Sequence, residues 1–138
     1  MRLTLAALFI ALAATAFAQE GHPLVGTWHG TYGPAAPQSA STKASGDGRT
    51  DVTIVLEYDG KAITGMMNPG PDAIRFDRVT LDPGNWSVHF EATSKARGKA
   101  APIVIDVTVQ DVTNRRRTLV GTWSQDGVRN DFEASRDD

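Results

Sequence analysis

A five-residue sequence, Leu-Val-Gly-Thr-Trp, occurs twice in this chain, at residues 24–28 and again at 119–123. Successive side chains of an extended strand point to opposite faces, so the leucine, glycine and tryptophan of each copy share one face. We expect each copy to be a strand that packs its tryptophan inside and has glycine where the wall bends. The two copies lie near opposite ends of the sequence, and we expect both in the wall of one closed barrel.

Apolar and polar residues alternate in short segments along the rest of the chain, which is typical of half-buried strands. Turn sequences rich in Asp, Asn, Pro and Gly separate them. In the segment 73–81, Val79 and Leu81 are out of phase with Ile74 and Phe76, which predicts a bulge. Tyr58 and Val128 continue the inward face of their strands. The predicted strands are residues 24–32, 50–58, 61–67, 73–81, 86–92, 103–110, 118–124 and 128–135.

This sequential set of amphipathic strands favours an all-β fold, a single antiparallel eight-stranded up-and-down β-barrel, with a sandwich as the alternative. Closure would remove the exposed edge strands. Alternate connections then meet at the same end, which brings together the two long ones, residues 33–49 and 93–102. Binding residues favour long loops on a rigid scaffold, so we expect this end to be an open mouth. The alternative is that both segments are flexible connections.

The first residues predict a secretory signal peptide. Arg2 precedes an apolar run from Leu3 to Thr15, and Ala16-Phe17-Ala18 matches a cleavage site. We expect a signal peptide at residues 1–18 and a barrel domain at 19–138, secreted or periplasmic. The apolar run is too short to cross a bilayer, so no membrane span is expected. The chain has no cysteine, so the domain must be stabilised by its core without disulfides.

The sequence carries no recognisable catalytic, metal or cofactor motif, so we expect no enzyme activity, no metal and no cofactor. His22, His29 and His89 have no spacing typical of metal ligands. The net charge of −2 argues against nucleic acid as a partner. The basic run at residues 115–117 could bind an anionic surface, although such runs are more often solvated turns. A second basic segment contains Lys95, Arg97 and Lys99, and we expect it at the opposite end of the barrel.

Gly26-x-Trp28-x-Gly30 resembles the opening strand of the calycin barrels, the lipocalins and avidins. The fuller pattern resembles small secreted bacterial lipocalin-like proteins of uncharacterised function. It includes the Asp59-Gly60 hairpin with Ile63-Thr64-Gly65, and the closing strand Phe132-Glu133-Ala134-Ser135-Arg136. The Thr-Asp-Tyr turn of lipocalins and the biotin-binding residues of avidin have no match in the chain. The resemblance therefore implies a barrel and a binding function without naming a ligand.

We therefore expect a binding protein, whose partner is a small hydrophobic ligand at the long-loop end or another protein. Alternatively, the barrel has a filled core and acts through protein contacts, as a protease inhibitor would. An enzyme on the same barrel would need an inward ionisable pair. The candidate residues could line an apolar cavity or fill a dry core. They are Trp28, Tyr32, Tyr58, Met67 and Trp86.

Overall fold

The computed structural model describes residues 22–34, 48–95, 98–112 and 116–136. The expected signal peptide lies outside the described residues, as do residues 35–47 of the long first connection and residues 96–97 of the second. The fold is all-β, as predicted. Its eight strands are β1 (Gly26–Gly33), β2 (Thr50–Tyr58), β3 (Ile63–Met67), β4 (Ile74–Asp82), β5 (Ser87–Ser94), β6 (Ala101–Gln110), β7 (Thr118–Gln125) and β8 (Val128–Arg136).

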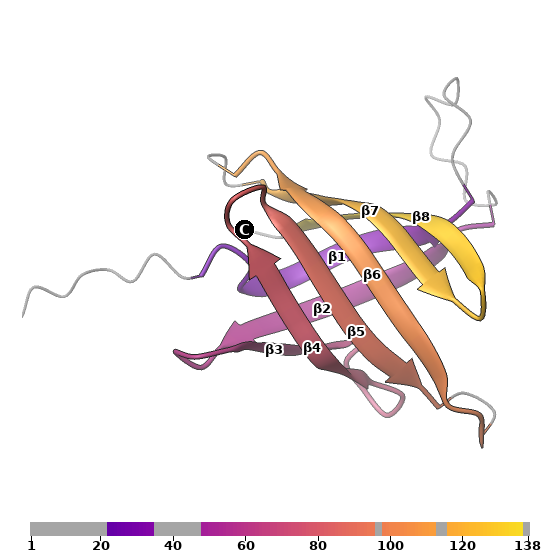
Figure 1. Ribbon diagram of the computed structural model, residues 1–138. Helices are drawn as coiled ribbons and strands as arrows, with labels where there is room; N and C mark the ends of the chain where they lie inside the picture. Colours follow the sequence, from indigo (N-terminus) through magenta and orange to yellow (C-terminus); the bar gives the residue numbers. More distant parts are fainter. Residues whose placement is uncertain (1–21, 35–47, 96–97, 113–115, 137–138) are drawn as a thin grey trace, which may run out of the picture.

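The strands follow one another around a closed antiparallel barrel, and β8 pairs with β1 to complete it (Figure 1). The up-and-down prediction is thus confirmed. The β1–β2, β3–β4, β5–β6 and β7–β8 connections share one end, called here the long-loop end. The β2–β3, β4–β5 and β6–β7 turns share the other, called the tight-turn end, where β1 begins and β8 finishes. Of the described residues, Arg116 and Arg117 of the basic run therefore lie at the opposite end from Lys95 and Lys99, as predicted.

The inward side chains form one continuous hydrophobic core, which the alternation predicts. Trp28 and Trp123, the tryptophans of the two repeated sequences, are both buried in it. Burying a large apolar side chain contributes roughly 1.5–3 kcal/mol, so this core is the main source of stability in a chain without disulfides. The buried apolar residues are Leu24, Trp28, Val52, Ile54, Leu56, Met67, Val88, Phe90, Ala92, Ile103, Ile105, Val107, Val109, Leu119, Trp123, Phe132 and Ala134.

The bulge predicted in β4 is present. The pairing of β4 with β5 shifts register between Phe76 and Arg78, so Asp77 is the extra residue. A bulge changes the face that the following residues occupy. Val79 and Leu81 consequently pack against the core, as do Ile74 and Phe76 before the bulge.

Two predictions of inward side chains are wrong. Tyr58 is 46% exposed and Val128 is 57% exposed. Tyr58 is the last residue of β2 and Val128 is the first residue of β8. Both strands extend past the layer of side chains that fills the barrel. The alternation of apolar and polar residues therefore continues at strand ends where no core side chains lie nearby.

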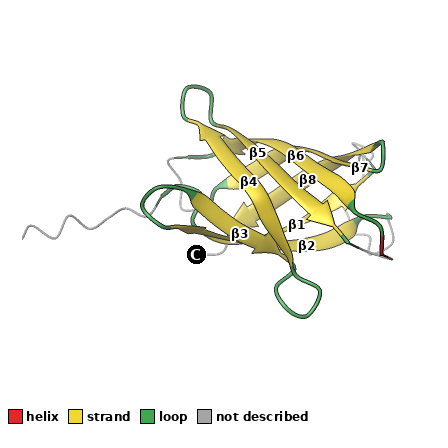
Figure 2. Ribbon diagram, turned by 60° about the horizontal axis from the view of Figure 1, so that its bottom comes forward, coloured by secondary structure: helices red, strands yellow, loops and turns green. Residues whose placement is uncertain are grey.

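The pairing between β3 and β4 is short, and it is called here the weak seam of the barrel wall. β3 and β4 pair through Met66–Arg75 and Met67–Ile74, whereas β2 and β3 pair along the whole of β3. From the β3–β4 connection the two strands diverge toward the tight-turn end (Figure 2). The divergence separates the β2–β3 hairpin from the β4–β5 hairpin on this side of the barrel.

Candidate binding site

Aromatic side chains fill the interior of the barrel toward the long-loop end. The rings of Tyr32 and Trp123 stack with centroids 4.0 Å apart, and Phe132 packs against Trp123 at 6.1 Å. On the tight-turn side, the Nε1 of Trp28 donates a hydrogen bond to the carbonyl oxygen of Leu24 at 2.9 Å. These contacts favour the interpretation of the central aromatics as a packed core.

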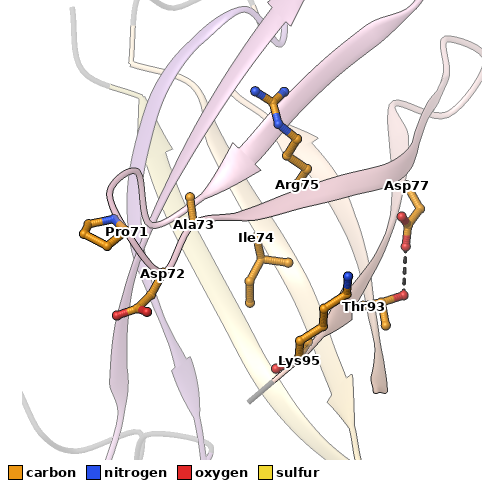
Figure 3. Close-up of a pocket in the computed structure, with 9 residues that line it drawn as sticks. Pro71, Asp72, Ala73, Ile74, Arg75, Asp77, Thr93 and Lys95 are labelled. Atoms are coloured by element: carbon orange, nitrogen blue, oxygen red, sulfur yellow. Dashed lines mark hydrogen bonds between the residues drawn. The ribbon is translucent and has the colours of Figure 1, made fainter. Parts of the chain in front are cut away.

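A pocket at the long-loop end lies between the start of β4 and the end of β5 (Figure 3). Asp72, Arg75 and Lys95 line it with both signs of charge, and Ile74 contributes its apolar part. The hydroxyl of Thr93 donates to Oδ2 of Asp77 at 2.9 Å across its side (Figure 3). This mixed lining does not match the mostly apolar lining of a site for a hydrophobic ligand.

The tight-turn end holds a more apolar pocket, called here the side cleft. It lies where β3 and β4 diverge, between the β2–β3 and β4–β5 hairpins. Its volume of about 630 Å³ falls within the range of roughly 300–1,000 Å³ for small-molecule sites. The lining residues are His22, Pro23, Tyr58, Lys61, Ala62, Ile63, Val79, Thr80, Leu81, Pro83 and Trp86.

The two hairpins line the side cleft from opposite sides. Tyr58 and Ile63 pair across the β2–β3 hairpin, while Val79 and Leu81 come from β4 after its bulge. Trp86 closes the β4–β5 turn with a φ of +56°, which is rare for a bulky residue and places it outside the regular strand. The cleft is therefore a product of the weak seam, the bulge and this turn.

The segment before β1 forms the third wall of the side cleft. The ring of His22 packs against that of Tyr58, with centroids 4.9 Å apart. Burial lowers the pKa of His22 because desolvation disfavours its charged form. The neutral ring is the form suited to a wall that is otherwise largely apolar.

A second pocket adjoins the cleft and is called here the basic pocket. It is lined by His22, Pro23, Val25, Trp86, Val112, Arg117 and Arg136. Nη1 of Arg117 donates to the carbonyl oxygen of Pro23 at 3.0 Å, and its Nε donates to that of Val112 at 2.9 Å. Nη1 of Arg136 also reaches the Pro23 oxygen, at 3.4 Å.

The five candidate residues fall in different parts of the barrel. Tyr58 and Trp86 line the side cleft. Trp28 and Met67 lie in the core, and Tyr32 is stacked on Trp123 toward the long-loop end. The structure thus brings together two of the five at the tight-turn end, away from the mouth that the loop lengths predict.

Sequence reasoning named Arg117 only as part of the basic run and missed Arg136 as a residue of the basic pocket. Arg117 belongs to the basic run at 115–117, but it is half-buried against the Pro23 carbonyl, so it is not a fully solvated turn residue. Arg116 is exposed, and Arg115 lies outside the described residues. The phase change at Val79 and Leu81 was the sequence signal for the apolar wall, but their partner hairpin could not be read from it.

A separate polar group lies on the outer wall. His89 Nδ1 and Asp106 Oδ1 are 2.5 Å apart across β5 and β6, and His89 Nε2 lies 3.4 Å from Glu91 Oε1. The hydrogen bond to Asp106 raises the pKa of His89. Within the described part of the chain, no group of three or more His, Cys, Asp or Glu residues could hold a metal ion.

No helix among the described residues has the length and hydrophobicity needed to cross a membrane. Comparisons with models of known protein families, with curated proteins and with solved structures found no match for this chain.

Proposed function

We propose that this barrel is a non-enzymatic binding protein that holds an apolar molecule in the side cleft. The observation that carries the proposal is the apolar wall formed by Tyr58, Ile63, Val79, Leu81 and Trp86 where the ladder between β3 and β4 ends. Apolar pockets with a few polar groups are the usual form of small-molecule sites. The ligand then lies at the opposite end from the mouth that the long loops predict.

We also propose that the protein is calycin-like and acts outside the cytoplasm after cleavage behind Ala18. The Gly26-x-Trp28-x-Gly30 strand supports the first part, because it opens a closed eight-stranded barrel here. The charged, apolar and small-residue order of residues 1–18 supports the second. Fractionation of the producing cell, with mass measurement of the mature chain, tests it. An uncleaved cytoplasmic chain would reject it.

Titration with N-phenyl-1-naphthylamine, an uncharged apolar fluorophore, tests the side cleft. We expect its emission to rise on saturable binding, and Tyr58→Ser to weaken the affinity about tenfold, equivalent to about 1.4 kcal/mol. Val128→Ser is the matched control, because it removes an exposed apolar side chain at the other end of the barrel. Equal affinities for both variants, or no saturable binding, would refute the site.

A protein partner is the second candidate, and the short β3–β4 ladder favours it. Beyond Met66 and Met67, β3 has no pairing with β4 among the described residues, so its Ile63–Gly65 edge could accept an extended segment of another chain. Hydrogen exchange measured with and without the captured partner would show added protection at residues 63–65. Protection elsewhere would reject this mode of binding.

A further inference from the structure

We propose that the side cleft binds planar aromatic molecules without a positive charge in preference to saturated ones, by stacking them between the rings of Tyr58 and Trp86. This inference rests on the proposed function and adds the chemical class of the ligand. A saturated molecule of the same size would fill the same apolar space without making the ring contacts. The aromatic preference and the apolar site can therefore be tested separately.

The two rings belong to opposite walls of the side cleft. Tyr58 ends β2 on the side of the β2–β3 hairpin, and Trp86 lies in the β4–β5 turn. Ile63, Val79 and Leu81 also line the cleft, and they pack against the hydrophobic core. Aromatic rings attract one another in offset-stacked or tilted arrangements, beyond the effect of the apolar area that they bury. A flat aromatic molecule in the cleft would therefore gain contacts with both walls.

The Tyr58 wall is held in place before any ligand binds. The hydroxyl of Tyr58 donates a hydrogen bond to the carbonyl oxygen of Gly60 at 3.0 Å, and the ring of His22 packs against the tyrosine ring. In the same hairpin, Oδ1 of Asp59 accepts a hydrogen bond from the backbone N–H of Lys61 at 2.8 Å. Tyr58 is nevertheless 46% exposed, so it keeps a surface that a ligand can cover.

The Trp86 wall is held by its backbone. A φ of +56° is unfavourable for a bulky residue, and such conformations are maintained by their surroundings, often at binding sites. The carbonyl oxygen of Trp86 accepts a hydrogen bond from the N–H of Val109 at 2.8 Å, which ties the turn to β6. Oδ1 of Asn85 accepts a hydrogen bond from the N–H of Ser87 at 3.1 Å. Because neither wall needs to rearrange, a rigid flat molecule would bind with little loss of conformational freedom.

The charge of the lining opposes a cation, the other kind of ligand that aromatic walls attract. Among the described residues that line the cleft, Lys61 carries a positive charge and none carries a carboxylate. Burial lowers the pKa of His22, so its ring is uncharged at neutral pH. A cation in the cleft would be repelled by Lys61 without a carboxylate in the described lining to balance it.

Isothermal titration calorimetry with two probes of one carbon skeleton tests the ring contacts. The first probe, 2-naphthol, is flat and aromatic, whereas decahydro-2-naphthol is its saturated and puckered counterpart with the same hydroxyl group. We expect 2-naphthol to bind about tenfold more tightly, because it gains aromatic contacts with two walls. Equal affinities for the two probes would overturn the inference.

Substitutions at Tyr58 test one wall directly. Tyr58→Leu should reduce the preference for 2-naphthol and leave the binding of decahydro-2-naphthol unchanged, because leucine is apolar but has no ring. Tyr58→Phe is the matched control, since it keeps the ring without the hydroxyl and should keep the preference. If Tyr58→Leu bound 2-naphthol as tightly as the wild type does, the tyrosine ring would not be a wall of the site.

Nuclear Overhauser contacts locate the bound molecule in the unmodified protein. The protons of 2-naphthol should show contacts to the side chains of both Tyr58 and Trp86. A lack of contacts to either ring, or contacts to Trp123 toward the long-loop end, would overturn the inference. This measurement decides the question even if Tyr58→Leu does not fold.

The outcomes separate this inference from the proposed function. If N-phenyl-1-naphthylamine binds at Tyr58 but the two naphthols bind equally, the apolar site stands and the aromatic preference is rejected. If neither the fluorophore nor either naphthol binds, both fail. If tetraethylammonium binds more tightly than 2-naphthol, the rings serve a cation and the inference is overturned.

Discussion

At the scale of single residues, the two copies of Leu-Val-Gly-Thr-Trp use glycine for different reasons. Gly26 has a φ of +133°, a backbone conformation that side chains rarely permit. At Gly121, a Cβ would lie 1.9 Å from the carbonyl oxygen of Asp106 and 2.7 Å from the Cα of Val107. The first glycine thus serves the entry into β1, and the second allows β7 to pack tightly against β6.

Replacing Gly121 by alanine should therefore destabilise the barrel strongly. The added methyl collides with the backbone of β6, which cannot move aside as a flexible side chain could. We expect a loss of about 3 kcal/mol in the free energy of unfolding, the upper part of the range for overpacking. Urea denaturation followed by tryptophan fluorescence measures it.

Gly127→Ala is the control for Gly121→Ala. Gly127 has a φ of +73° and nothing within 4 Å of the added Cβ. Its alanine variant should lose about 1 kcal/mol, from the left-handed backbone alone. If the two variants were equally stable, close packing between β6 and β7 would not be the reason for glycine at position 121.

At the scale of the strands, β5 and β6 are joined on their outer faces by His89 and Asp106. The hydrogen bond to Asp106 raises the pKa of His89, and the nearby Glu91 acts in the same direction. A raised pKa in the folded state means that folding favours the protonated ring. The stabilisation is fully present below the ordinary pKa of about 6.5 and is lost as the pH rises through the higher folded-state pKa.

The difference in stability between the wild type and His89→Asn should consequently shrink between pH 6 and pH 9. Its size should stay below about 1 kcal/mol, because His89 is partly exposed to water. Denaturation of both proteins across this pH range measures it. Taking the difference cancels His22, whose lowered pKa gives the opposite sign. A difference that is constant or grows with pH would contradict the pairing with Asp106.

The bulge in β4 determines which face Val79 and Leu81 occupy. Deleting Asp77 should remove the extra residue and force either these two side chains outward or β4 out of register with β5. We expect a loss of about 3 kcal/mol in unfolding free energy, corresponding to two partly buried apolar side chains. Thermal and urea denaturation measure it.

Asp77→Ala is the matched control for the deletion, since it keeps the length of β4. It removes the carboxylate that accepts the hydrogen bond from Thr93, so we expect a loss of about 1 kcal/mol or less. If the substitution and the deletion had equal effects, the side chain of Asp77 would matter and the bulge would not.

At the scale of the whole molecule, the sequence predicts the barrel well because apolar and polar residues alternate within each strand. The order of the strands, the inward tryptophans and the β4 bulge all follow from local alternation. The side cleft does not, because it depends on how far β3 and β4 diverge after two residue pairs. The basic pocket depends on Arg117 and Arg136 meeting at Pro23, three residues from distant parts of the chain.

The long connection between β1 and β2 should be removable in large part without unfolding the barrel. Tyr32 pairs with Thr50, so β1 and β2 are already joined where their connection begins. Arg49 strengthens this junction through Nε to the Thr31 hydroxyl at 2.9 Å and Nη1 to the Pro34 carbonyl oxygen at 2.7 Å. Deleting residues 36–46 leaves these contacts in place. Since loop entropy changes slowly with length, the free energy of unfolding should change by about 1 kcal/mol or less.

The same deletion decides which end of the barrel binds. The side cleft lies at the tight-turn end, and none of its described lining residues belongs to the β1–β2 connection. The shortened protein should therefore bind N-phenyl-1-naphthylamine with unchanged affinity in fluorescence titrations. If it stayed folded but lost this ligand, the binding site would be at the long-loop end, as the loop lengths alone predict. Retained binding would show that the long connection is separate from the site.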